Sequence, residues 1–479
     1  MKARRVPNMS GRGALALAFA LGLAGCAVGP DYQSALDEAP GQAAFVNGTA
    51  AEFSAAQVLQ TDWWRLYQDP ALDALVNEAL AANRDLRVAA ANLERAEALW
   101  RESRTPLLPS TTVNASETYS RQNYFFGDAP LSTQNNIYNA NLSIAYQVDL
   151  FGRVRRAIEA ARADAQAVRA AYESTRITVV GAVVRSYAAA CHANRQLTVA
   201  EQNLQLQSDR LALTRNLLDA GRGTAMEVAT GAAQQAQTRA LIPQLRANRQ
   251  AVLYQLAALL GHTPDQVPPA AMACESAPTL QALIPVGDGA QLLRRRPDVL
   301  QAERNLAAAT ARIGVATAEL YPNVSFAAGI GSAAQASGDL FSSDTEIWNY
   351  GPSLSWVFPN ITGVRARIRQ AEASTEAALA RFDAAWLDAL RETETAMTSY
   401  LEALQRRAAL AEVSQHSDDA ARLAQLRFNA GQLNYLDVLQ AELNAVNARI
   451  GLVAGDAEIS ALQVDLFLAL GGGWSADQE

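Results

Sequence analysis

The sequence predicts a mainly α-helical protein that is internally duplicated and carries a few membrane-facing β-strands. Three observations lead to this fold class. Long alanine-rich segments keep apolar residues at helical spacing, short segments between them alternate apolar and polar residues, and the same order of segments occurs twice in 479 residues. Each half is expected to run helix, strand, strand, very long helix, glycine turn, helix.

The N-terminus has the form of a processing signal that precedes this fold. Residues 1–25 combine a basic start with the apolar run ALALAFALGL, which is too short to span a membrane. The following LAGC resembles the bacterial lipobox, in which the cysteine, here Cys26, becomes the lipid-modified first residue. An ordinary signal peptide with an incidental cysteine is the alternative. Ala27, which is not an aspartate, favours export of such a lipoprotein to the outer membrane.

Charge and composition exclude several function classes. The chain has a net charge of −8, and removing residues 1–25 leaves 36 basic against 48 acidic residues, or −12. An acidic chain without basic clusters argues against a nucleic-acid partner. The histidines His192, His262 and His416 are scattered, and the sequence contains no hydrolase, metal-site or phosphate-loop motif. We expect no enzyme activity, no catalytic residues, no metal and no cofactor.

The duplication sets the expected domain boundaries. Corresponding residues lie about 210 to 213 positions apart, as do Asp85 and Asp298 or Gly261 and Gly471. After the signal peptide we expect five segments: an N-terminal lipid-anchored segment at 26–70, a first repeat at 71–261, a linker at 262–296, a second repeat at 297–471 and a C-terminal tail at 472–479.

Each repeat contains one very long helix. From Gly152 to Asp219 apolar residues recur every three or four positions, and the pattern returns 210 residues later. Such a helix would reach roughly 100 Å at ~1.5 Å per residue, too long for a compact core. Two heptad stripes along it, one containing Leu204 and Leu211 and the other Leu206, predict packing on two sides, as in a curved wall. The shorter helices, stacked end to end, would nearly match its length, which favours a tube of hairpins.

Four segments have the period of two that is typical of strands, at about 109–127, 136–149, 321–335 and 346–358. Their lengths and aromatic ends are typical of membrane-spanning strands, although a strand in a soluble sandwich shows the same alternation. Four strands cannot close a barrel, and an open edge in lipid leaves backbone groups unpaired. We therefore expect the strands to be pooled between chains, three chains giving twelve. Pro352 lacks an N–H and needs a bulge or an end position.

Two further cysteines remain, Cys191 in a helical stretch and Cys274 in a loop. Nothing in the sequence places them together, so two unpaired small residues are the favoured interpretation. A periplasmic disulfide is the alternative.

Several motifs together resemble one family. They are CAVGPDY at Cys26, TDWWRLYQDPALDALVNEAL at Thr61, YQVDLFGR at Tyr146, LLRRRPDVLQAE at Leu292 and WNYGPSLSWVFPN at Trp348. The chain resembles the outer-membrane efflux factors, which are the TolC-like channels, and within them the lipid-anchored OprM/NodT branch. The resemblance covers essentially the whole mature chain.

The resemblance implies a homotrimer with a twelve-stranded barrel in the outer membrane and a long α-helical barrel in the periplasm, surrounded by an equatorial region. It implies contact with outer-membrane lipid, a periplasmic membrane-fusion adaptor protein and an inner-membrane pump, most often of the resistance-nodulation-division class. The expected function is to pass drugs or other small toxic compounds across the outer membrane without chemistry. A type I protein-secretion channel and a non-pore periplasmic coiled-coil lipoprotein are the alternatives.

The glycine turns, expected at about 219–224 and 429–434, are the periplasmic hairpin tips of that family. The turn glycines are Gly221, Gly223 and Gly431. By position, the resemblance assigns the gate to Leu436, Asp437 and Gln440 in the second repeat and to Met226, Glu227 and Thr230 in the first. Gln440 departs from the acid that many relatives carry there, which leaves Asp437 and Glu227 to supply the charge. Helix capping alone also explains both acids, and this alternative stays open.

Overall fold

The structure is a computed structural model that describes residues 27–37, 45–54, 59–126, 129–280, 282–359 and 361–472. The predicted signal peptide, the predicted lipidation site Cys26 and residues 473–479 of the expected tail lie outside the described residues. The chain forms two compact units, each built from three stretches of sequence. The first unit comprises 1–35, 93–168 and 302–382, and the second comprises 36–92, 169–301 and 383–479.

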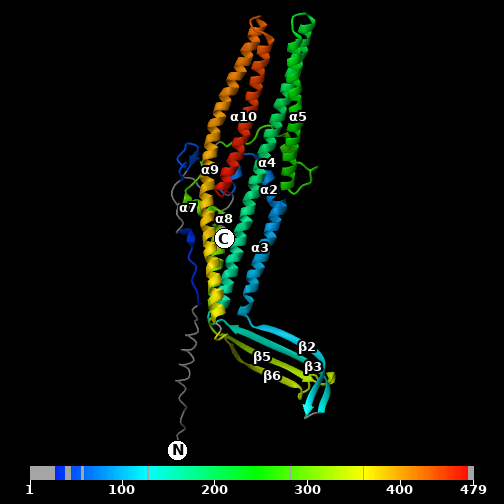
Figure 1. The fold of residues 1–479 in the computed structure, drawn as a ribbon, viewed down its shortest axis with the longest axis vertical. Helices are drawn as coiled ribbons and strands as arrows, with labels where there is room; N and C mark the ends of the chain where they lie inside the picture. Colours follow the sequence, from blue (N-terminus) through cyan, green and yellow to red (C-terminus); the bar gives the residue numbers. More distant parts are fainter. Residues whose placement is uncertain are drawn as a thin grey trace, which may run out of the picture. The chain divides into compact units, whose positions relative to one another are not determined.

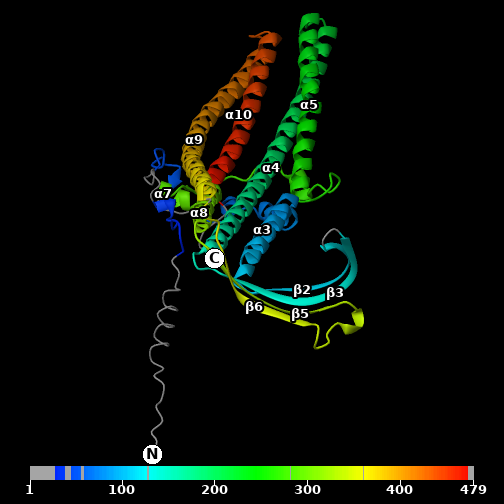
Figure 2. The same cartoon turned by 60° about the horizontal axis from the view of Figure 1, so that its bottom comes forward.

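The first unit holds a four-stranded antiparallel sheet (Figures 1 and 2). The strands are β2 (Ser110–Phe126), β3 (Ala129–Val148), β5 (Asn323–Ala334) and β6 (Glu346–Ser355), in the order β2-β3-β5-β6. The register places Val113, Leu142, Ile330 and Trp348 opposite one another in a single row. Because side chains alternate between faces, this row and the rows two residues away share one face of the sheet.

Two strand boundaries differ from those expected. β3 begins at Ala129 rather than near residue 136, because backbone pairing with β2 continues where the alternation of side chains has stopped. β6 ends at Ser355 rather than near 358, because its partner β5 starts at the residue opposite, Asn323. Pro352 lies inside β6 opposite Phe326 in an unbroken register, so the expected bulge or end position was wrong. β6 is an edge strand of the described sheet, where a missing N–H breaks no bond within one chain.

The helices follow the order expected from the duplication. The first set is α3 (Arg84–Ser103), α4 (Arg153–Asp219) and α5 (Ala225–Leu259), and the second is α8 (Pro297–Ala318), α9 (Ile361–Asn429) and α10 (Tyr435–Ala469). The long helices α4 and α9 have 67 and 69 residues. Within one chain the two stripes on α4 differ: Leu211 is buried and Leu204 half-buried, whereas Leu206 and Leu213 are exposed. Among the described helices, none combines the length and the apolar character needed to cross a membrane.

The second unit has a hydrophobic core built from segments far apart in sequence. Trp63, in the 3-10 helix at Trp63–Tyr67, is fully buried and stacks on Phe467 of α10 with 4.5 Å between ring centroids. The remaining elements here are α2 (Pro70–Ala82), α6 (Pro269–Ala273), α7 (Gly289–Arg295), and the two-stranded parallel pair β1 (Phe53–Ser54) and β4 (Ile284–Pro285). The segment before α2 and the segment between α5 and α8 therefore pack together beside the helices.

The favoured interpretation of the cysteines was wrong. Cys191 of α4 and Cys274 form a disulfide, with 4.8 Å between their Cα atoms. The segment after α5 folds back onto α4, where the Asn194 amide donates to the carbonyl oxygens of Ala271 at 3.1 Å and of Cys274 at 2.6 Å. The bond could not be predicted from spacing, because 83 residues separate the two cysteines.

Candidate functional site: the tips of the helical hairpins

In the second unit, α4 and α5 form one hairpin and α9 and α10 form another, and the two turns lie at the same end (Figures 1 and 2). We call residues 220–224 and 430–434 the tips. Both tips end a long helix in the same way. Gly221 has φ +71° and Gly431 has φ +70°, in the left-handed region that favours glycine.

The hydrogen bonds at both tips complete a Schellman motif. In the first tip the N–H of Arg222 donates to the Leu217 carbonyl at 2.8 Å and the N–H of Gly221 donates to that of Leu218 at 2.9 Å. In the second, Gln432 and Gly431 make the equivalent bonds to Arg427 and Phe428, both at 2.9 Å. Gly223, the third predicted turn glycine, does not have a positive φ. Unlike Gly221 and Gly431, it is not required by a left-handed backbone.

The helices that leave the tips are capped differently. Thr224 and Glu227 form a full capping box: the Thr224 Oγ1 accepts from the Glu227 N–H at 3.3 Å and the Glu227 Oε2 accepts from the Thr224 N–H at 2.7 Å. In the second tip the Asn434 side chain accepts from the Asp437 N–H at 2.9 Å. Within the described residues the Asp437 carboxylate makes no hydrogen bond of its own and is exposed. Capping therefore accounts for Glu227 more fully than for Asp437.

The other predicted gate residues lie on the first turns of α5 and α10. Met226 is exposed, and the Thr230 hydroxyl donates to the Met226 carbonyl at 2.9 Å. Leu436 is half-buried against a cluster that includes Tyr435, Val438 and Leu439. Gln440 is exposed and donates to the Asn444 side chain at 3.1 Å. No hydrogen bond or ion pair in the described chain joins the α5 set directly to the α10 set.

The link between the hairpins is instead an arginine that sequence reasoning missed. Arg210 of α4 makes an ion pair with Glu442 of α10, and its Nη1 donates to Gln425 Oε1 of α9 at 3.4 Å. The Arg210 and Glu442 side chains are only 24% and 16% exposed, and they line a cavity of about 340 Å³ between the hairpins. Burial lowers the pKa of the Arg210 guanidinium, an effect that the nearby Tyr435 opposes. An arginine remains charged at any physiological pH, so the site holds a poorly solvated cation that depends on Glu442.

Most other ion pairs near the tips join helices of the same hairpin. Arg246 pairs with Glu201 at 2.7 Å within the first hairpin, and Arg449 pairs with Asp418 at 2.8 Å within the second. Between α4 and α10, the further polar links are His192 to Ser460 at 2.9 Å and the ion pair of Arg185 with Asp465. Among the described residues, Arg210 thus provides the charged link between hairpins that lies closest to the tips.

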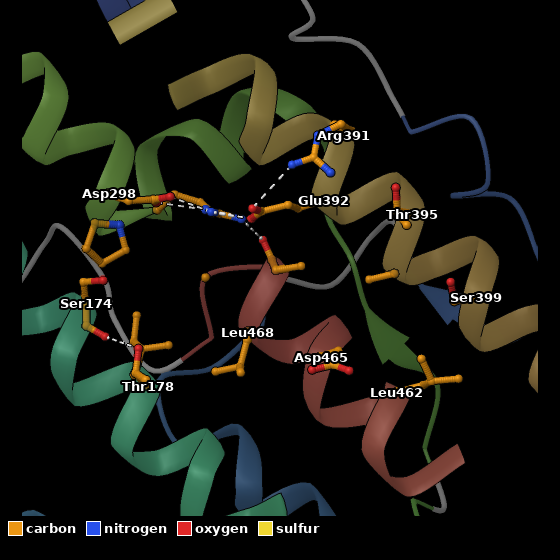
Figure 3. Close-up of a pocket in the computed structure, with 16 residues that line it drawn as sticks. Ser174, Thr178, Asp298, Arg391, Glu392, Thr395, Ser399, Leu462, Asp465 and Leu468 are labelled. Carbon is orange, nitrogen blue, oxygen red and sulfur yellow. Dashed lines mark hydrogen bonds and ion pairs between the residues drawn. The ribbon is translucent and has the colours of Figure 1, made fainter. Parts of the chain in front are cut away.

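A second charged cluster occurs where α10 ends and α8 begins, beside a cavity of about 420 Å³ (Figure 3). Arg296, from the RRPD motif, donates to the Ala469 carbonyl at 3.1 Å, to Asp298 Oδ2 at 2.5 Å and to Glu392 Oε2 at 2.9 Å. Burial works against the charge, but hydrogen bonds and the charges of Asp298 and Glu392 raise the pKa of Arg296 overall. In the first repeat the neutral Asn83 donates to the Leu259 carbonyl at 2.9 Å in the same role. This cluster joins two stacked helix ends.

Within the first unit, the segment that follows Cys26 is held by hydrogen bonds to α4 and α8. Arg156 donates to the carbonyl oxygen of Val28 at 3.2 Å and to the Asp31 carboxylate at 2.6 Å, and the Tyr32 hydroxyl donates to the buried Glu303 at 2.6 Å. The N–H of Val28 donates to the carbonyl of Phe151, at the junction of β3 and α4. The chain thus emerges beside the end of the sheet.

The described residues contain no cluster of His, Cys, Asp or Glu that could hold a metal ion. The family of outer membrane efflux proteins matches residues 75–262 and 289–472, which is most of the chain. The chain belongs to the outer membrane efflux protein family.

Relatives agree over nearly the whole length. The chain is 30% identical to the outer membrane protein OprJ of Pseudomonas aeruginosa, covering 96% of both chains, and 29% identical to the probable efflux pump outer membrane protein TtgC of Pseudomonas putida, covering 95% of this chain and 94% of TtgC. Nodulation protein T of Rhizobium leguminosarum bv. trifolii is 27% identical, with 95% and 96% covered. The solved structure of the outer-membrane channel OprN superposes with a TM-score of 0.86 at 34% identity and covers 94% of this chain and 100% of that one.

These findings confirm the predicted family, its OprM/NodT branch and the TolC-like fold. The chain is the outer-membrane channel component of a tripartite efflux system, located in the outer membrane and extending into the periplasm. The family is a transport family rather than an enzyme family.

Proposed function

We propose that three copies of the chain form one channel, whose strands close a twelve-stranded barrel and whose tips form a periplasmic gate. The sheet of one chain supports this assembly, because β2 and β6 are its two edges and unpaired edges are not tolerated in lipid. The exposed stripe on α4, with Leu206 and Leu213, supplies an apolar surface that a neighbouring helix would cover.

The partners of this channel are a periplasmic membrane-fusion adaptor at the tips and an inner-membrane pump of the resistance-nodulation-division class. The cargo is small toxic compounds. Curated relatives are named for efflux of antibiotics, toluene and solvents, which supports apolar or amphipathic small molecules as the substrate class. Deleting the gene and measuring drug and solvent accumulation tests this, and a changed profile of secreted proteins with unchanged accumulation would favour a type I secretion channel instead.

The mass of the detergent-extracted complex tests the assembly. Light scattering or native mass spectrometry should give three chains per particle, and a stable monomer or dimer would overturn the pooled barrel. The same mass measurement tests lipidation, because Cys26→Ser should lose the mass of the acyl groups. The position of Val28 beside the end of the sheet supports an anchor that enters the adjacent leaflet.

The gate is proposed to consist of Leu436, Asp437 and Gln440 with Met226, Glu227 and Thr230. The observation that carries this proposal is the exposed Asp437 carboxylate, which the cap does not use. A narrow acidic opening focuses the field and makes the pore prefer cations. Reversal potentials in a salt gradient measure that preference, and a preference for anions would contradict it.

Amide variants separate gating from capping. Asp437→Asn removes a charge and leaves the Asn434 cap intact, and Glu227→Gln keeps an acceptor for the Thr224 N–H. We expect lower cation selectivity in both variants and unchanged thermal stability. If selectivity is unchanged in both, the acids serve the helix ends and not the pore.

A further inference from the structure

The loop that joins β5 to β6 forms one wall of a groove on the sheet of the first unit. The groove has a volume of about 530 Å³, within the usual range for small-molecule sites. Its apolar lining comes from three strands and the loop: Val113 of β2, Leu142 of β3, Ile330 of β5 and Phe341 of the loop. Polar residues also line it, namely Asn141, Ser332, Ser342, Ser343 and Glu346. All of these residues belong to one chain and one compact unit.

The loop is built to display Phe341. This side chain is 79% exposed, and its backbone has φ +74°, which is costly for a residue with a Cβ. The N–H of Phe341 donates to the Oγ of Ser332 at 3.2 Å, and Ser332 is only 2% exposed. Thr345 ties the same loop together through bonds to Ser332 at 2.9 Å and to the Asp339 carbonyl at 2.9 Å. A buried polar anchor thus holds an exposed aromatic residue in a strained conformation.

The groove lies on the apolar face of the sheet. Val113, Leu142 and Ile330 stand in one row with Trp348, and this face continues through Phe326 and Tyr350. The opposite face carries polar side chains such as Asn139 and Ser143. In an outer-membrane protein the apolar face is the one that meets lipid.

The position along the strands places the groove in the half of the membrane away from the helices. β5 starts at Asn323, next to the stacked ring pair Phe151 and Tyr321, which is typical of an interfacial aromatic girdle. Ile330 is seven residues further along, roughly 23 Å at ~3.3 Å per residue, or about 18 Å of height at a tilt of ~40°. The apolar band of such proteins is ~25 Å tall, so the groove falls within its outer half.

We propose that this groove binds an acyl chain of an outer-leaflet lipid, with Phe341 as the clamp. The groove is continuous with the lipid-facing surface of the sheet, it opens at outer-leaflet depth, and Val113, Leu142 and Ile330 give it an aliphatic lining on the strands. The lipid would fix the β5–β6 loop and anchor that end of each chain in the outer leaflet. One chain supplies the whole groove, so its lining does not depend on the gate, but its exposure to lipid rests on the proposed barrel.

The depth of position 341 in the membrane is measured first, with a nitroxide label on a single introduced cysteine. Cys191 and Cys274 are bonded to each other and the proposed lipid occupies the thiol of Cys26, so Phe341→Cys can be labelled in the folded protein in vesicles of outer-membrane lipid. Trp348→Cys is the lipid-facing control, and Arg222→Cys at the first tip is the aqueous control. The label at 341 should collide with oxygen more than with a water-soluble nickel chelate, as at 348. A label at 341 that behaves like the one at 222 would overturn the proposal.

Lipid bound in the groove is measured by native mass spectrometry of the complex extracted from its own membrane. We expect Phe341→Ser to lose one retained lipid per chain relative to the wild type, and Phe341→Leu to keep it. Because Phe341 is exposed, we expect the same thermal unfolding in the wild type and both variants, and this is measured so that a folding defect is separated from lipid loss. Equal lipid retention in the wild type and Phe341→Ser would refute the clamp.

Discussion

Removing the Arg210 guanidinium should separate the two hairpins at the tips. Arg210→Met keeps most of the side-chain volume and leaves Glu442 poorly solvated without its cation. Breaking a fully buried ion pair costs about 3–5 kcal/mol, and the partial exposure of both side chains reduces this to about 2 kcal/mol. If the pair is made only while the hairpins are together, the equilibrium shifts about 30-fold toward separated tips.

Single-channel recording in planar bilayers measures this shift as higher conductance or a longer open time. Arg246→Met is the matched control, because its partner Glu201 lies in the same hairpin and the pair does not bridge the two. The double variant Arg210→Met/Glu442→Met removes both charges and should return the channel toward the closed state. Two results would contradict this role of Arg210: Arg210→Met opens the channel no more than Arg246→Met does, or the double variant stays as open as the single one.

Three further predictions concern stability, measured by thermal or denaturant unfolding of the extracted protein. Replacing Cys191 by serine, or reducing its bond to Cys274, should cost about 4–5 kcal/mol in the chain-entropy estimate for a loop closed across 83 residues, and no change on reduction would contradict the bond. Burial lowers the pKa of His192 from its ordinary value of 6.5, so as the pH drops this histidine takes up a proton in the unfolded chain before it does so in the folded one. The free energy of unfolding should therefore fall below about pH 6.5, and His192→Gln should make it depend less on pH. Gly431→Ala should lower the free energy of unfolding by about 1–2 kcal/mol, because the positive φ of Gly431 is unfavourable for alanine although there is space for its Cβ. Gly451→Ala, inside α10, should raise the free energy of unfolding by up to about 1 kcal/mol. Both substitutions changing stability in the same direction would contradict this prediction.

Local features were predictable because their causes are local. The bounds of α4 and α9 could be predicted to within a few residues, because apolar residues recur every three or four positions along the whole of each helix. The turns were predictable because a chain that reverses after a long helix needs a left-handed residue, and Gly221 and Gly431 supply it. The strand limits were less accurate, because backbone pairing in β3 extends past the alternating segment.

The functional contacts depend on pairs that no spacing rule brings together. Cys191 meets Cys274 only because the segment after α5 folds back onto α4. The partners Arg210 and Glu442 belong to different repeats, and each alone resembles an ordinary charged residue on a helix surface.

The sequence by itself determined the duplication, the order of helices and strands, the turn positions and the family, because each is written in short-range periodicity or in contiguous motifs. Only the tertiary structure decided which charge joins the hairpins, which cysteines pair and which loop residue lies over the sheet. Those outcomes follow from the packing of distant segments, where burial and pairing depend on three-dimensional neighbours and not on position along the chain.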